Sequence, residues 1–306
     1  MRRSGRRGHR VLTAFAVVGL APAALAACGA TPEEPRPSPS STGIRTLSPL
    51  PAPPTPPATG RLFADMRQSS LDVALGQMQV WVRNDTLHDL RPTRIVYTDG
   101  RFSRPLPATR LREIPSRHER GFPIALPARP RCGSEATHGT LELWYDGHHD
   151  TLRVSDETDV PGRFLEARCQ ELAVAGVARL SWADHVRVED RDGQPVGVLR
   201  LLIRPSGRGD SQLRIETISG TPMISTAGGE AWRPDLTVRS TDPPSHLDLE
   251  MQPARCDDHV FMEGGGSTAF KTSVTVDGRP ATVLLRMSGP GAAQAIAYVR
   301  EACGKE

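Results

Sequence analysis

The densest group of potential metal ligands in the chain is the segment WYDGHHD, residues 144–150. It contains two imidazoles and two carboxylates: Asp146, His148, His149 and Asp150. These ligand types suit zinc or copper, and His138 could add a third imidazole from across a hairpin. Adjacent strand residues point to opposite faces, so His148 and His149 share an ion only if the turn bends them together. A solvated Asp-Gly turn explains the segment without a metal.

Motifs that identify an enzyme are missing from the sequence. It has no Gly-x-Ser-x-Gly elbow, no His-Glu-x-x-His and no Ser-x-x-Lys. The glycine-rich EGGGST, residues 263–268, lacks the lysine of a phosphate-binding loop and is interpreted as a flexible loop. The sequence therefore predicts neither a cofactor nor a catalytic residue. An envelope enzyme or metal-binding protein with a site near Asp146 to Asp150 remains the alternative.

Four cysteines fall within a pattern that occurs twice. In the order FPIALPARPRC, LELWYDGHHDTLRV, PGRFLEARC, and again LDLEMQPARC, TSVTVDGRPATVLLRM, PGAAQAIAYVREAC, a strand runs into a cysteine, two strands flank an Asp-Gly turn, and Pro-Gly leads to a second cysteine. We interpret this as a tandem duplication. The repeat predicts disulfides Cys132–Cys169 and Cys256–Cys303, each stabilising its domain by roughly 3 to 4 kcal/mol.

The first residues indicate export. Five arginines and no acid precede the apolar run from Val11 to Ala27, which is short for a membrane span. The run ends in Leu25-Ala26-Ala27-Cys28, which resembles the lipobox of bacterial lipoproteins. The resemblance implies a signal peptide over residues 1–27 and a diacylglycerol on Cys28. It also implies a mature chain held at the outer face of the cell membrane by that lipid.

Charge argues against nucleic acid as a partner. The chain has 38 basic and 35 acidic residues, a net charge of +3. Without the five arginines of the signal segment, the balance is 33 to 35, or −2. The basic character therefore belongs to the segment that is removed, and no basic footprint for nucleic acid remains. Arginine far outnumbers lysine, which indicates a GC-rich genome such as that of an actinobacterium.

The chain divides into a tether and two domains. Residues 28–62 are dominated by proline, serine, threonine and alanine, which cannot bury a core, so we expect a disordered, extended tether. The remainder suits two domains, predicted at residues 63–172 and 173–306.

Strand patterns dominate both predicted domains. Short runs rich in branched and aromatic residues predict strands at 78–82, 93–97, 141–145, 199–203, 213–218, 247–251 and 282–287. Asp-Gly turns separate several of them. One helix is predicted over residues 291–302, and residues 163–168 are expected to form a shorter turn. The predicted fold is all-β, two tandem antiparallel sandwiches with one disulfide each.

The two repeats resemble the immunoglobulin-like β-sandwiches found in tandem on bacterial surface lipoproteins. The resemblance implies a binding or structural module of the cell envelope, with an envelope protein or glycan as partner. Alternation places Met78, Val80 and Val82 in the core and Trp81 on the outer face, either as packing or as a ligand contact. Trp232 lies in a loop-like setting, either anchoring a partner or folding back over the sandwich.

Overall fold

The structure is a computed structural model that describes residues 56–135, 137–191, 193–262 and 266–305. The predicted signal peptide, Cys28 and the tether as far as residue 55 lie outside these residues. Strand β1 begins at Arg61, and just before it Thr59 donates from its backbone N–H to Asp85. None of the helices in the described residues is both long and apolar enough to cross a membrane.

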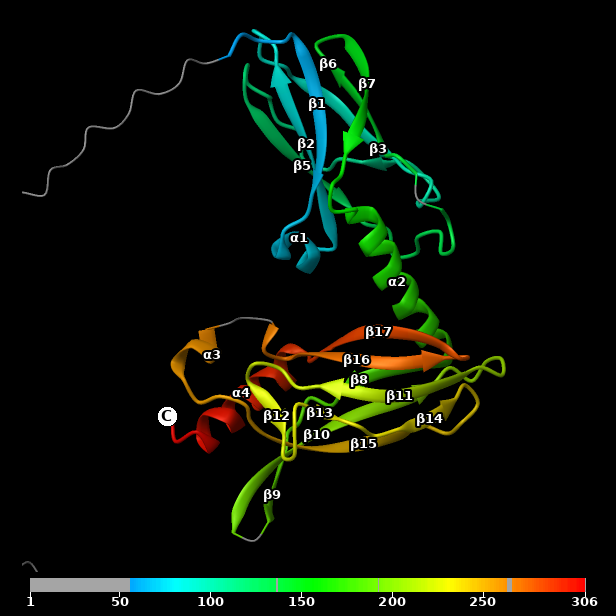
Figure 1. Cartoon of the computed structure of the whole chain (residues 1–306), viewed down its shortest axis with the longest axis vertical. Helices are drawn as coiled ribbons and strands as arrows, with labels where there is room; N and C mark the ends of the chain where they lie inside the picture. The colour runs from blue at the N-terminus through cyan, green and yellow to red at the C-terminus, as the bar shows by residue number, and fades with distance from the viewer. Residues whose placement is uncertain (1–55, 136, 192, 263–265, 306) are drawn as a thin grey trace, which may run out of the picture. The chain divides into compact units, whose positions relative to one another are not determined.

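The first sandwich contains seven strands (Figure 1). Their bounds are β1 (Arg61–Arg67), β2 (Gln77–Asp85), β3 (Pro92–Thr98), β4 (Leu106–Pro107), β5 (Glu119–Ala125), β6 (Thr140–Tyr145) and β7 (His148–Ser155). The pairing order is β4-β3-β6-β7-β1-β2-β5, and β1 meets β7 in a short parallel pair. The other pairs are antiparallel, so β1-β2-β5 and β4-β3-β6-β7 form two layers around one core.

Alternation along each strand builds the first core. In β2, Met78, Val80 and Val82 are fully buried, whereas the residues between them face outward, as predicted. They pack with side chains of the other layer, such as Ile95 and Leu141. The alternation therefore determines which face of the layer β1-β2-β5 packs in the core and which face is turned away from it.

The second sandwich contains two five-stranded sheets. Their bounds are β8 (Ala178–Trp182), β9 (Arg187–Arg191), β10 (Gln194–Pro205), β11 (Gln212–Ser219), β12 (Ile224–Thr226), β13 (Ala231–Trp232), β14 (Leu236–Arg239), β15 (Ser245–Pro253), β16 (Ala269–Val276) and β17 (Arg279–Arg286). One sheet has the order β12-β15-β10-β8, with β9 on β10. The other has the order β13-β11-β16-β17, with β14 on β11.

The two sandwiches share the connectivity of six strands. Strands β8-β10-β15 of the second correspond in order and pairing to β1-β2-β5 of the first, and β11-β16-β17 correspond to β3-β6-β7. These are the two layers of an immunoglobulin-like sandwich. In each, the last hairpin turns on Asp-Gly, with positive φ at Asp146 and Gly147 and at Asp277 and Gly278. The repeated connectivity supports the predicted duplication.

A helix follows the last strand of each sandwich. Helix α4 (Gly289–Ala302) confirms the prediction, and Ser288 caps its first turn by accepting the N–H of Gly291. The expected short turn at 163–168 is wrong, because α2 is an 18-residue helix (Val160–Val177). It crosses the predicted domain boundary between residues 172 and 173. Two further helices, α1 (Ser70–Ala74) and α3 (Asp258–Met262), have five residues each.

The two disulfides are those that the repeat predicted. Cys132 pairs with Cys169 of α2, and Cys256 pairs with Cys303, which caps the end of α4. Each bridge joins the connection after β5 or β15 to the helix that follows the last hairpin. The bridges therefore fasten equivalent helices to equivalent points, unlike the inter-sheet disulfide of antibody domains.

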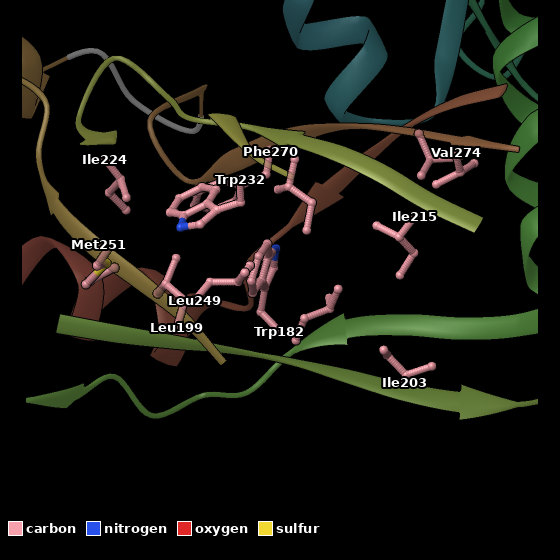
Figure 2. Packing of buried hydrophobic residues seen from close by; sticks show 14 of the residues in the cluster. Trp182, Leu199, Ile203, Ile215, Ile224, Trp232, Leu249, Met251, Phe270 and Val274 are labelled. Atoms are coloured by element: carbon pink, nitrogen blue, oxygen red, sulfur yellow. The ribbon is translucent and has the colours of Figure 1, made fainter. Parts of the chain in front are cut away.

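The core of the second sandwich is built around aromatic side chains. Figure 2 shows Trp182, Trp232 and Phe270 among the aliphatic residues of both sheets. The rings of Trp182 and Phe270 lie 4.7 Å apart between centroids, and the indole N–H of Trp182 donates to the carbonyl of Leu285. Each buried tryptophan thus satisfies its one polar atom inside the fold.

Candidate binding surface

The aspartate of the WYDGHHD hairpin has a structural role. A carboxylate oxygen of Asp146 accepts the backbone N–H of Arg91 at 3.0 Å, at the entrance to β3. The second sandwich repeats this contact, since Asp277 accepts the backbone N–H of Gln212 at 2.8 Å. The turn aspartate therefore satisfies a neighbouring strand in both copies.

The two adjacent histidines of the hairpin contact different aromatic residues. The His149 ring stacks on Trp144 with centroids 4.5 Å apart, whereas His148 lies 5.8 Å from the ring of Tyr145. The Tyr145 hydroxyl donates to Asp150 at 2.6 Å. Burial, together with that hydrogen bond, raises the pKa of Tyr145 to about 12. Strand alternation thus separates the imidazoles, as expected.

The last metal candidate, His138, contacts an arginine. Its Nε2 lies 3.1 Å from a guanidinium nitrogen of Arg153. Among the described residues, no three His, Cys, Asp or Glu side chains are grouped so that they could hold an ion. The structure therefore does not bring the five candidates together as ligands.

Trp232 packs into the second core. It is 9% exposed, its indole N–H donates to the carbonyl of Glu250 at 2.7 Å, and its ring lies 6.1 Å from Phe270 (Figure 2). The prediction that Trp232 folds back over the sandwich is confirmed, and the alternative that it anchors a partner is wrong. The preceding Gly228 and Gly229 gave it a loop-like setting in the sequence.

A hollow of about 1110 Å³ beside Trp232 offers little chemistry. Two carboxylates of β15 line it, but Asp248 is paired with Arg200 at 2.7 Å and Glu250 with Arg191 at 2.7 Å. The other charged residues of the lining, Glu230 and Arg233, are exposed at its edge. Much of the remaining lining is the glycine-containing chain between β11 and β13. The hollow is therefore large, but it holds few polar groups that could orient a ligand.

Sequence reasoning missed a buried ionic cluster at the start of α2. Arg101, 5% exposed, donates to both oxygens of Asp99 at 2.9 and 2.7 Å and to Asp159 at 2.5 Å. The Tyr97 hydroxyl also donates to Asp99. Burial opposes ionisation of Asp99, but the hydrogen bonds from Arg101 outweigh it and lower its pKa. Asp159 is the N-cap of α2, so the cluster joins that helix to the end of β3.

The strongest candidate for recognition is a groove on the outer face of β1 and β2. It has a volume of about 820 Å³, and arginines and aromatic rings line it together with residues of β7. We call it the arginine–aromatic groove and define it by Arg61, Phe63, Arg67, Trp81, Arg83 and Arg153. Alternation predicted the outward position of Trp81, but the partners of Trp81 come from other strands.

Trp81 lies between a guanidinium group and the backbone. The Arg67 guanidinium carbon is 4.7 Å from the centroid of the indole ring. On β5, a Cβ added to Gly121 would stand 2.8 Å from the same ring, so glycine permits the indole to lie against the strand. Arg67 in turn pairs with Glu119 at 2.8 Å and Asp65 at 2.8 Å. Trp81 is thus a half-buried packing residue that supports an arginine.

Phe63 supports the second half of the groove. The guanidinium carbon of Arg83 lies 4.3 Å from its ring centroid and that of Arg61 lies 5.8 Å away. Phe63 and Arg83 are direct neighbours in the β1–β2 register. Stacked guanidinium groups keep their N–H edges available for hydrogen bonds in the plane of the group. The groove can therefore bind oxyanions.

Fold and surface together define a protein of two immunoglobulin-like β-sandwiches, each with one disulfide. No protein-family model matches the chain, and no curated protein does.

Solved structures show weak similarity. Red sea bream transglutaminase is 9% identical with a TM-score of 0.21, over 74% of this chain and 31% of the transglutaminase. The CupB2 chaperone of Pseudomonas aeruginosa is 10% identical (TM-score 0.20; 70% of this chain, 95% of the chaperone). The calcium-binding domain CBD12 of CALX1.1 is 15% identical (TM-score 0.21; 79% and 87%). These values carry no argument about function.

Proposed function

We propose that the protein is an exported lipoprotein that acts as a binding module of the cell envelope. Cys28 carries the diacylglycerol, and the proline-rich tether, which ends where β1 begins at Arg61, separates the sandwiches from the membrane. The lipobox-like end of the apolar segment supports the anchor. The two disulfides support export, because such bonds persist in oxidising compartments.

The arginine–aromatic groove is the observation that supports a binding role. It concentrates four arginines and two aromatic rings on one outer face, and Arg and aromatic residues are the types enriched where proteins recognise partners. Its side chains are ordered by stacking and by ion pairs within the sandwich, so less conformational entropy is lost on binding.

Replacement of Cys28 tests the anchor. We expect Cys28→Ser to move the protein from the membrane fraction to the soluble fraction of the cell envelope, because no acyl chains can be attached. Fractionation followed by immunoblotting measures the distribution. The matched control is the double variant Cys132→Ala/Cys169→Ala, which removes two other cysteines and should stay with the membrane. If Cys28→Ser also stays there, the lipoprotein assignment is wrong.

A further inference from the structure

We propose that the arginine–aromatic groove and helix α1 together form a docking surface for a protein segment that carries carboxylates beside apolar side chains. The proposal rests on the proposed function and names the ligand class of its binding surface. It also extends that surface to α1, which closes the turn between β1 and β2.

In the groove, guanidinium groups face outward and cover the faces of the aromatic rings. Arg67 covers one face of Trp81, and the ring lies against Gly121 of the neighbouring strand. Arg83 lies over Phe63 at 4.3 Å. A sugar that binds by stacking needs an open aromatic face, whereas a stacked guanidinium is oriented for carboxylate. The chemistry therefore favours an acidic ligand.

Three arginines of the groove form no direct ion pair in the described residues, although Arg83 is near enough to Asp85 and Glu119 to lower the pKa of both carboxyls. Within the parts of the chain that the structure describes, Arg61, Arg83 and Arg153 form no ion pair with a carboxylate, whereas Arg67 pairs with two. Arg200 on the outer face of β10, by contrast, pairs with Asp248 at 2.7 Å. Asp65, Glu119 and Glu157 also line the groove, so its four arginines exceed its carboxylates by one positive charge. A partner's carboxylate would complement that charge.

Helix α1 buries an acidic side chain and exposes its apolar side chains. Its Asp72 is 3% exposed and accepts hydrogen bonds from Gln77 and Gln79 of β2, both at 2.8 Å. Its apolar residues point to solvent instead, with exposures of 66% for Leu71, 53% for Val73 and, just after the helix, 62% for Leu75. A protein keeps such a patch exposed at a cost, and a partner that buries it would gain free energy.

The two features are continuous along β1 and β2. Gln68, directly after β1, lines the groove and donates to the carbonyl of Gln77. Gln79, which holds Asp72, stands two residues before Trp81 on the same face of β2. Apolar side chains beside guanidinium groups match a protein segment better than a polysaccharide, which has no aliphatic side chains to bury.

Peptide selection tests the docking surface. The purified full chain is used to select random dodecapeptides displayed on phage, with counter-selection on the bare support only. We expect enriched peptides to combine Asp or Glu with apolar residues. Calorimetry should then show binding weakened by about tenfold or more in Arg83→Gln, because a bidentate charged contact is lost, and similarly in Leu71→Ser/Leu75→Ser. Arg214→Gln, an exposed arginine of β11, is the matched control and should bind normally.

Three outcomes would overturn the proposal. The first is a selection that enriches no peptide family, and the second is a set of enriched peptides that bind Arg83→Gln as tightly as the parent chain. Polygalacturonate, which carries carboxylates on a glycan, is titrated in parallel, and binding as tight as that of the peptides would reject a protein segment. Arg83→Lys separates charge from geometry and should weaken peptide binding less than Arg83→Gln. Membrane fractionation of Cys28→Ser tests the lipid anchor independently. A negative result for peptide binding at the groove therefore leaves the lipoprotein assignment intact.

Discussion

At the scale of single residues, Asp72 explains the unusual orientation of α1. The helix begins with a capping box, in which Ser69 and Asp72 each accept the backbone N–H of the other. The same carboxylate accepts the two glutamine amides of β2, so it must face the sheet. Its neighbours Leu71 and Val73 are consequently directed toward solvent, because adjacent helical positions point to different sides.

Asp72 should make stability dependent on acid. Burial favours the protonated form, but hydrogen bonds from Ser69, Gln77 and Gln79 outweigh it and lower the pKa of Asp72 from 3.8 to about 2. Because the folded-state pKa is lowered, the stabilisation is present above pH 4 and is lost as pH falls from about 4 toward 2. It amounts to about 2 kcal/mol.

Denaturation of Asp72→Asn measures this contribution. At pH 7 we expect the free energy of unfolding to fall by about 2 kcal/mol, and the difference from the parent should disappear near pH 2. Asp210→Asn, at an exposed position, is the control and should change little at either pH. A loss of stability that is equal at both pH values would contradict the ionic role of Asp72.

At the scale of elements, the Arg101 cluster fastens the start of α2 to β3. Replacing Arg101 with Met leaves Asp99 buried without its cation, so we expect unfolding to become easier by about 3 to 5 kcal/mol. Chemical denaturation measures the change, with the exposed Arg104→Met as control. If Arg101→Met is as stable as that control, the cluster does not stabilise the helix start.

The double variant Asp99→Asn/Arg101→Met refines the measurement. It removes both charges, so it should lose less stability than the sum of the single variants, because the uncompensated buried carboxylate is gone. The cluster escaped prediction because Asp99-Gly100 has the sequence of an ordinary exposed turn. Its burial depends on α2, which lies some sixty residues later in the chain.

Strands and helices differed in how far the sequence predicted them. The seven named strand segments were found, the last ending at Arg286, because alternating branched residues and Asp-Gly turns are local signals. Helix α2 was missed because its ends belong to different clusters: Val160 and Phe164 pack in the first core, Val174 and Val177 in the second. Its apolar residues therefore do not follow one face, which is the pattern that predicts a helix.

The groove was only partly predictable for a related reason. Period-two alternation placed Trp81 on the outer face of β2, and this is a property of one strand. The stacking of Arg83 on Phe63 depends on the register between β1 and β2, in which the two residues are direct partners. The two strands are joined through α1, whose outward apolar residues gave no helical pattern to recognise.

At the scale of the whole molecule, each of the two sandwiches has its own disulfide at an equivalent position, in addition to the common order of the matching strands. The bonds close segments with separations of 37 and 47 residues. In the chain-entropy model, each lowers the entropy of the unfolded chain enough to stabilise its sandwich by about 4 kcal/mol. The longer segment adds about 0.2 kcal/mol, since the term grows with the logarithm of length.

The double variants Cys132→Ala/Cys169→Ala and Cys256→Ala/Cys303→Ala should therefore lose nearly equal stability. Calorimetry should show a lower melting temperature in both variants. A reductant should lower the melting temperature of the parent, but it should cause no further loss in a variant that combines all four substitutions. A melting curve that reductant leaves unchanged would contradict the stabilising role of the bonds. A large loss in one variant alone would show that one copy depends on its bridge for more than chain entropy, because the two bridges close segments of similar length at equivalent positions.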